Sequence, residues 1–176
     1  MKLTTKSRYG TRLILDLAVY GKDKPVPLSD VSSRQNISLK YLEQITRKLK
    51  RAGIIDSCRG PSGGHMLAKS PDEISIGQIV RILEDSTVIA DCADQKKKVC
   101  AICDRAGECL SRWVWIEAGR AMYDCLDKIT IASLLSIENK DFKKTDHPFH
   151  PLNGLLLTAQ NPMNAFGKLF YLHRLH

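Results

Sequence analysis

The chain has 176 residues, of which 43% are hydrophobic, so it is long enough to bury a core of its own. Its N-terminus is polar and basic, and no apolar run approaches the roughly 20 residues of a membrane helix, so we expect no secretory signal, no membrane partner and a cytoplasmic location. The net charge of +8 is concentrated in residues 1–70, which contain 14 Lys/Arg and 5 Asp/Glu and so carry a net charge of +9. A basic module of this kind favours nucleic-acid binding, although an ordinary solvated basic surface has the same composition.

Three helices are predicted in the basic module. Apolar residues at helical spacing predict the first helix over Thr5–Tyr20. A short second helix is predicted over Leu28–Asn36, with Ser29 as its N-cap. The third is predicted over Leu39–Ala52, with Ser38 as its N-cap. The tight spacing of the second and third helices indicates a helix-turn-helix.

The outer face of the third helix is basic and amide-rich, as a recognition helix requires. Such a helix enters the major groove, where Gln and Arg hydrogen-bond base edges and Lys neutralises phosphates. An ordinary amphipathic helix remains the alternative. Glu43 is either a sequence discriminator, because a carboxylate repels base acceptors and phosphates, or a solvated side chain. The expected DNA contacts are Ser38, Lys40, Tyr41, Glu43, Gln44 and Arg47, with Arg59 from the next segment. Thr4, Lys6 and Arg8 are further candidates for phosphate contacts.

Residues 54–68 read as strand, Gly/Pro-rich turn and strand, which predicts a β-hairpin. A hairpin directly after a recognition helix is a wing, and Arg59 at its base is placed to enter the minor groove. The same glycines could cradle a nucleotide phosphate, but no Lys-Ser/Thr pair follows them as in a P-loop.

The rest of the chain divides into a helix, an irregular segment and two more helices. Helices are predicted over Ser75–Asp85 and Ser111–Ile129, and Thr130 is expected to cap a last short helix through Leu135. The long helix carries a 4-3-4-3 apolar seam that indicates packing against a second subunit, against the chain's own domain, or both. The seam residues are Trp115, Gly119, Met122, Leu126 and Ile129.

The predicted fold class is therefore mainly α with a small β-hairpin: a winged helix-turn-helix with a long C-terminal dimerisation helix. We assign residues 1–85 to the DNA-binding domain and residues 86–110 to a cysteine-rich cluster-binding loop. Residues 111–138 form the dimerisation helix and the short last helix, and residues 139–176 form a tail that we expect to be largely disordered.

Four of the six cysteines, Cys92, Cys100, Cys103 and Cys109, fall within 18 residues. Structural disulfides are rare in the cytoplasm, so this crowding indicates metal or redox chemistry. An iron–sulfur cluster, a tetrahedral zinc site and a reversible thiol switch all remain open, because the spacing is neither a standard zinc-finger nor a ferredoxin pattern. The isolated Cys58 and Cys125 are expected to be small core residues.

Several motifs in order carry a family resemblance: Met1–Tyr9, Ile37–Gln44, Arg59–Gly64 and the cysteine group. From Met1 to about Ile137 the chain resembles the IscR-type transcriptional regulators of the Rrf-two family. The resemblance implies a homodimeric bacterial regulator, not an enzyme, that binds a pseudo-palindromic operator in double-stranded DNA. It also implies an iron–sulfur cluster, of the 2Fe–2S type, that senses iron–sulfur status, redox state or nitric oxide.

The cysteine group departs from the family pattern of three cysteines and a histidine. Cys92, Cys103 and Cys109 match the three cysteines, but Arg112 stands at the histidine position. Arginine stays protonated and is not an ordinary cluster ligand. The extra Cys100 would replace the histidine and give the all-thiolate set that is common for iron–sulfur clusters. The alternatives are a zinc-bound or cluster-free thiol-responsive regulator of the same fold, for example of cysteine metabolism, and an iron–sulfur carrier protein; no small-molecule substrate is expected.

Overall fold

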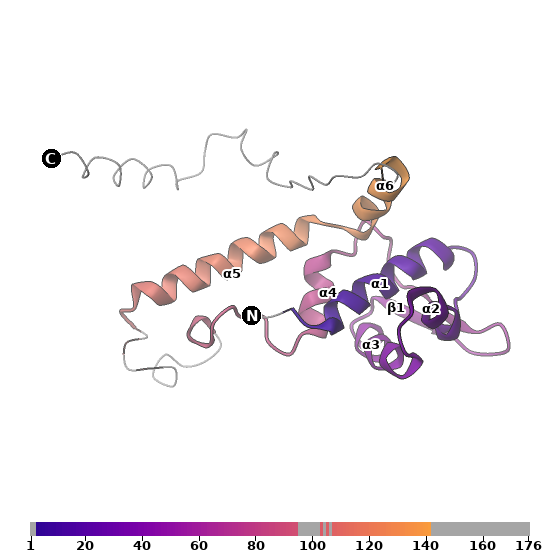
Figure 1. Cartoon of the computed structure of the whole chain (residues 1–176), viewed down its shortest axis with the longest axis horizontal. Helices are drawn as coiled ribbons and strands as arrows, with labels where there is room; N and C mark the ends of the chain where they lie inside the picture. Colours follow the sequence, from indigo (N-terminus) through magenta and orange to yellow (C-terminus); the bar gives the residue numbers. More distant parts are fainter. Residues whose placement is uncertain (1–2, 95–102, 104, 106, 142–176) are drawn as a thin grey trace. The chain divides into compact units, whose positions relative to one another are not determined.

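The computed structural model describes residues 3–94, 103, 105 and 107–141, and the chain through Asp141 forms one compact unit. Figure 1 shows its helices and its two-stranded hairpin, which confirm the predicted fold class. None of the helices in this part of the chain is long and apolar enough to cross a membrane. The elements are α1 (Thr5–Tyr20), α2 (Leu28–Gln35), α3 (Leu39–Arg51), β1 (Ile55–Cys58), β2 (Gly64–Leu67), α4 (Ile76–Leu83), the 3-10 turn η1 (Asp91–Ala93), α5 (Leu110–Lys128) and α6 (Ile131–Asp141).

Helix α2 begins at Leu28 as predicted, but its N-cap is Pro27 and not Ser29. Pro27 lies in extended backbone, with φ −63° and ψ 141°, and its ring holds φ near the value that the entry to this helix uses. The hydroxyl of Ser29 instead donates to the carboxylate of Asp30 within the first turn. Proline thus fixes the start of this helix without a side-chain cap.

The turn between α2 and α3 is short and well defined. Asn36 ends α2 in the left-handed region, with φ 51° and ψ 51°, which asparagine tolerates better than most residues. Ile37 is buried against the core, and Ser38 is the N-cap of α3, as predicted. At the other end of α3, Gly53 has φ +68°, which suits a residue just past a helix.

The hairpin is joined to the segment before α2 through the start of β2, near its turn. β1 and β2 are antiparallel, with Ile55 opposite Leu67. Val26 and His65 exchange backbone hydrogen bonds of 2.8 Å in both directions. A Cβ on Gly64 would lie 2.5 Å from the carbonyl carbon of Val26, so only glycine allows this approach. The hairpin is therefore held close to the helical core.

The core lies largely between α1, α3 and α4, and the apolar side chains that these helices bury in it include Leu13, Ile14, Leu17, Leu42, Leu49, Ile79 and Leu83. One charged group is buried at its edge. The carboxylate of Asp16 accepts hydrogen bonds from Arg34 Nε at 3.1 Å, from Arg34 Nη2 at 2.6 Å and from Gln35 Nε2 at 2.9 Å. These bonds fix α2 against α1, and they satisfy a carboxylate that would otherwise be costly to bury.

The C-terminal helix α6 packs against the rest of the compact unit. Thr130 caps α6 as predicted, because its hydroxyl accepts from the amide of Ser133 at 3.1 Å. Ile131 is buried, and its amide donates to the carbonyl of Ile74 at 2.9 Å. α6 ends at Asp141, beyond the expected end at Leu135. The predicted tail from residue 142 onward lies outside the described residues.

Candidate nucleic-acid interface and cysteine segment

The recognition helix α3 separates a buried face from an exposed one. Leu42, Ile45, Thr46 and Leu49 point into the core. The predicted DNA-contacting residues lie on the opposite side, where Ser38, Lys40, Glu43, Gln44 and Arg47 are all exposed. The helix therefore presents two basic side chains and one amide together, which is the chemistry that reads base edges and phosphates.

Tyr41 lies at the margin of this exposed face and not at its centre. Its ring meets the ring of Tyr9 edge-on, with the centroids 5.6 Å apart. Its hydroxyl is 3.1 Å from the hydroxyl of Thr5. Tyr41 thus joins the recognition helix to the first turns of α1, while its half-exposed position leaves it at the edge of the candidate interface.

The wing lies next to the C-terminal end of the recognition helix. Arg59 follows β1 directly and is exposed, and Gly60 after it has φ +114°, a value that only glycine adopts easily. The ammonium group of Lys50 on α3 donates to the hydroxyl of Ser57 on β1. The exposed recognition helix and the guanidinium on the wing therefore belong to one folded unit.

A buried acid joins the end of α4 to the start of α1. Oε1 of Glu84 accepts from the amide of Thr4 at 2.9 Å, from the Thr4 hydroxyl at 3.1 Å and from the Ser7 hydroxyl at 2.5 Å. Burial raises the pKa of Glu84, but these hydrogen bonds outweigh it and leave the pKa below its ordinary value. Glu84 is thus held in its charged form.

The next residue, Asp85, bridges two lysines from different helices. Its Oδ2 lies 2.5 Å from Nζ of Lys6 on α1, and its Oδ1 lies 3.3 Å from Nζ of Lys48 on α3. Lys48 also donates to the carbonyl of Leu83 at 3.3 Å. Neither Glu84 nor Asp85 was predicted as a functional residue from the sequence, because their partners lie 37 to 80 residues away and no local pattern connects them.

The predicted cysteine ligands are only partly within the described residues. Cys92 and Cys109 are half-buried, Cys103 is exposed, and all three are free thiols; Cys100 lies outside the described residues. Among the side chains that the structure describes, no three His, Cys, Asp or Glu groups come close enough together to hold a metal ion. The four-cysteine site therefore remains a prediction.

Arg112, at the family's histidine position, has a different role here. Its Nε donates to the backbone carbonyl of Cys92 at 2.7 Å. Arg112 lies in the first turn of α5, which begins directly after Cys109 as N-cap. This contact therefore brings the backbone of Cys92 beside the helix start that carries Cys109.

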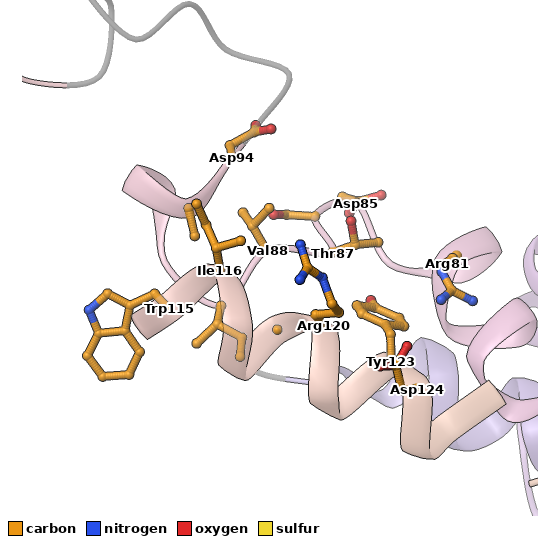
Figure 2. A pocket seen from close by; sticks show the side chains of 14 residues that line it. Arg81, Asp85, Thr87, Val88, Asp94, Trp115, Ile116, Arg120, Tyr123 and Asp124 are labelled. Carbon is orange, nitrogen blue, oxygen red and sulfur yellow. The ribbon is translucent and has the colours of Figure 1, made fainter. Parts of the chain in front are cut away.

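An open cavity of about 540 Å³ lies between α5 and the segment that leads from α4 to Cys92. Figure 2 shows Arg120 and Tyr123 on α5 facing Asp85, Thr87 and Val88 of that segment. At one end, the Arg81 guanidinium lies 4.3 Å from the centroid of the Tyr123 ring. The segment therefore contacts α5 through a few side chains and leaves space between them.

Two cysteine predictions were wrong. Cys58 and Cys125 were expected in the core, but both are exposed. Cys58 ends β1, where the hairpin leaves the core, and β1 buries only Ile55 at its other end. Cys125 belongs to α5, which has no buried residue along its whole length. Neither position is enclosed by packed apolar side chains.

Comparison with known proteins identifies the family. The model of the Rrf2 family, described as iron-dependent transcriptional regulators, matches residues 3–137. The chain belongs to the Rrf2 family. This Rrf2 protein is therefore a DNA-binding transcriptional regulator and not an enzyme, and α2, α3 and the hairpin form its winged helix-turn-helix.

Three relatives illustrate the range of this family. The Rrf2 chain is 43% identical to protein rrf2 of Nitratidesulfovibrio vulgaris over 77% of its own length and 87% of that protein. It is 35% identical to the transcriptional regulator IscR of Aliivibrio salmonicida over 95% of its length and 97% of that protein. It also resembles the structure of CymR, the global cysteine regulator of B. subtilis, with 31% identity, a TM-score of 0.62, and coverage of 78% of this chain and 98% of that one.

Proposed function

We propose that this Rrf2 regulator is a homodimer that binds a pseudo-palindromic operator in double-stranded DNA. An iron–sulfur cluster on the cysteine segment tunes its DNA affinity in response to iron–sulfur status, redox state or nitric oxide. The observation that carries the proposal is the hydrogen bond from Arg112 to the carbonyl of Cys92, which brings two parts of the predicted site together. Membership of a family of DNA-binding regulators, with IscR among the relatives, supports operator binding and its control by a cluster.

The donor chemistry of the cysteine segment fits a cluster. Cys92, Cys103 and Cys109 are free thiols, and thiolates are the usual ligands of iron–sulfur clusters. Arg112 is engaged by a backbone carbonyl, and arginine is not an ordinary cluster ligand, so we do not assign it as the fourth ligand. We assign that position to Cys100, and we infer the 2Fe–2S type from the family resemblance. When bound, the cluster would supply a redox-sensitive group with an all-thiolate ligand set.

The cysteine segment is well placed to influence the DNA-binding face. The segment directly follows Asp85, which contacts Lys48 on the recognition helix, and Cys92 lies seven residues after Asp85. Ordering of this segment by a cluster would change the position of one recognition helix relative to the other in a dimer. Half-sites lie about 34 Å apart, so a small change in angle alters the fit. A coupling of about 1–3 kcal/mol is enough for a 5–150-fold change in affinity.

The surface of α5 supports the homodimer. The helix spans 19 residues without a single buried one in the isolated chain. Its exposed apolar side chains include Leu110, 84% exposed, Trp113, 62% exposed, and Val114, 49% exposed. Such side chains on one helix are typical of an interface, since their burial by a partner is favourable by about 25 cal/mol per Å². Part of the predicted seam faces the chain itself, because Gly119 lies beside Ile89.

The DNA contacts follow from the exposed face of α3 and from the wing. We propose base contacts from Gln44 and Arg47, phosphate contacts from Lys40, and a minor-groove contact from Arg59. Ser38, Tyr41 and Glu43 complete the interface, with Glu43 disfavouring some sequences by repulsion. The site of action is the bacterial cytoplasm, where operator DNA is found.

The experiment that tests the cluster is purification without oxygen, followed by an absorption spectrum and assays of iron and acid-labile sulfide. We expect bands at roughly 320–460 nm and nearly equal iron and sulfide in the wild-type protein. The Cys100→Ala and Cys103→Ala variants should lose the absorption bands together with the iron and sulfide. Cys125→Ser is the matched control, because this cysteine is exposed on α5 outside the cysteine segment and its variant should keep the cluster. Wild-type protein with neither iron nor sulfide after reconstitution would overturn the cluster.

A cluster-free, thiol-responsive regulator is the second candidate function. It is favoured by the resemblance to CymR, named as a global cysteine regulator, and by the exposed thiol of Cys103. This candidate predicts protein without iron or sulfide whose DNA affinity changes on thiol oxidation and recovers on reduction. Zinc without sulfide would instead indicate a tetrahedral thiolate site.

A further inference from the structure

The two lysines that Asp85 bridges lie beside the recognition helix. Lys48 is one turn after Gln44 on α3, and Lys6 belongs to the first turn of α1. That turn packs on α3, because the Thr5 hydroxyl lies 3.1 Å from the hydroxyl of Tyr41. Lys6 and Lys48 therefore lie along the flank of α3 that carries Tyr41, next to the face that we assign to the base edges.

A flank of a recognition helix is where phosphates come close. The major groove is about 12 Å wide, and a helix with its side chains is about 10–12 Å across. A helix that fills the groove has its flanks against the two phosphate backbones. Ammonium groups on such a flank are expected to neutralise phosphates and to release counterions.

Asp85 competes with those phosphates for the same ammonium groups. Its carboxylate is 75% exposed, whereas Lys6 and Lys48 are 35% and 43% exposed, so the acid lies at the surface and not beneath the lysines. The hydrogen bond from Lys6, together with that from Lys48, holds the pKa of Asp85 below its ordinary value. At neutral pH this carboxylate is therefore charged, and it offsets one of the two positive charges on this flank.

We propose that Asp85 is a positioning residue that engages Lys6 and Lys48 and so limits how many lysines beside the recognition helix reach DNA phosphates. Asp85 opens the segment that leads to Cys92, and it also lies at the rim of the cavity beside α5 (Figure 2). The residue that engages these lysines therefore directly precedes the segment that carries the cysteines. The proposal rests on the proposed DNA-binding mode of α3.

The test is the salt dependence of binding to a duplex of random sequence, measured by fluorescence anisotropy. Asp85→Asn keeps the shape of the side chain but removes its charge. We expect tighter binding at low salt and a plot of log affinity against log salt that is steeper by about one to two units, because each added phosphate contact contributes about 0.9. Adding Lys6→Gln and Lys48→Gln to Asp85→Asn should remove this gain.

Asp72→Asn is the matched control, because it makes the same change in net charge at an exposed carboxylate that contacts Ser70. Pro71 beside it accepts from the amide of Ala132 on α6, which places Asp72 at the α6 end of the unit. Its salt slope should equal that of the wild type. Asp85→Ser, checked by circular dichroism, gives a second variant if the asparagine form does not fold.

The outcomes separate the two proposals. If the wild type binds duplex DNA and Asp85→Asn has the same slope as Asp72→Asn, the role of Asp85 is overturned and the DNA-binding mode stands. If the steeper slope persists after both lysines are replaced, the role is also overturned, since other cations would account for it. If the wild type binds no duplex DNA at all, the proposed function fails and this inference fails with it.

Discussion

Nε of Arg112 donates a hydrogen bond to the backbone carbonyl of Cys92 at 2.7 Å, across 20 residues of sequence. The residue at the family's histidine position thus fastens the cysteine segment to α5 through the backbone. An arginine here is compatible with a cluster site because it anchors the segment and leaves ligation to thiolates.

This contact predicts a specific defect in Arg112→Ala. The variant should still assemble a cluster, because all four proposed ligands remain, but the segment that carries Cys92 loses its anchor to α5. We expect cluster absorbance to decay several-fold faster in air or in the presence of a chelator, since outer contacts commonly change metal retention by about 10-fold or more. Lys128→Ala is the control, because this exposed cation lies at the other end of the same helix. Equal decay rates for the two variants would contradict the anchoring role.

Substitutions on the recognition helix should weaken DNA binding in two different ways, through sequence preference or through overall affinity. Gln44→Ala should relax sequence preference, with a loss of about 1–3 kcal/mol of discrimination at one base pair, because an amide reads base edges. Lys40→Ala should weaken binding to all sequences alike and reduce the salt slope by about one unit. Selection from a random duplex pool measures the first effect, and a salt titration measures the second. An unchanged preferred site for Gln44→Ala would remove Gln44 from the base contacts.

The charge on Glu84 should make a pH-dependent contribution to the free energy of unfolding. Burial raises its pKa, but hydrogen bonds from Ser7 and Thr4 outweigh burial, so the folded-state pKa lies below the ordinary value of 4.5. A depressed folded-state pKa stabilises the protein above the unfolded-state value, and this contribution is lost as the pH falls through the folded-state value. Glu84→Gln should therefore lower the free energy of unfolding by about 1–2 kcal/mol at neutral pH, because charge-assisted bonds become neutral ones.

Thermal unfolding followed by circular dichroism between pH 7 and pH 3 measures this contribution. The difference between wild type and Glu84→Gln should shrink as the pH falls below about 4.5. Asp23→Asn, at an exposed carboxylate in the loop after α1, should change the melting temperature little at any of these pH values. A constant difference between wild type and Glu84→Gln across the range would show that charge on Glu84 is not the cause.

Local sequence patterns predicted the elements well, because their signals lie within a few residues of one another. The apolar spacing of α1 gave its bounds of Thr5–Tyr20, and Ser38 and Thr130 were correctly expected as caps. The helix start at Leu28 was predicted correctly, but its N-cap was not, because two candidate caps compete there and the backbone preference of Pro27 outweighs the hydroxyl of Ser29.

The contacts that connect the elements could not be predicted in this way. Glu84 meets Thr4 across 80 residues, and Arg112 meets Cys92 across 20, with no periodic pattern between the partners. Cys125 was expected in the core because isolated cysteines usually are small core residues, but this general tendency does not say which side of α5 faces the chain's own unit. These relationships depend on the packing of α5 and α4, which only the three-dimensional structure supplies.

The exposed apolar surface of α5 predicts the effect of a charge at Trp113, which is 62% exposed in the isolated chain. Trp113→Glu should raise the dimer dissociation constant roughly 30-fold or more, because loss of a central aromatic contact commonly costs about 2 kcal/mol. Analytical ultracentrifugation over a range of protein concentrations measures this dissociation constant. Val19→Glu is the control, at an apolar residue that is 42% exposed on α1. A Trp113→Glu protein that stays dimeric like the Val19→Glu protein would exclude this part of α5 from the interface.

The central claim is that a cluster on the cysteine segment changes DNA affinity. The most direct measurement compares the dissociation constants of cluster-loaded and cluster-free wild-type protein for one operator, selected from a random duplex pool, without oxygen and at one salt concentration. We expect a difference of about 5–150-fold that disappears in Cys103→Ala. Dissociation constants that agree within about twofold, for protein with a full complement of iron and sulfide, would contradict it.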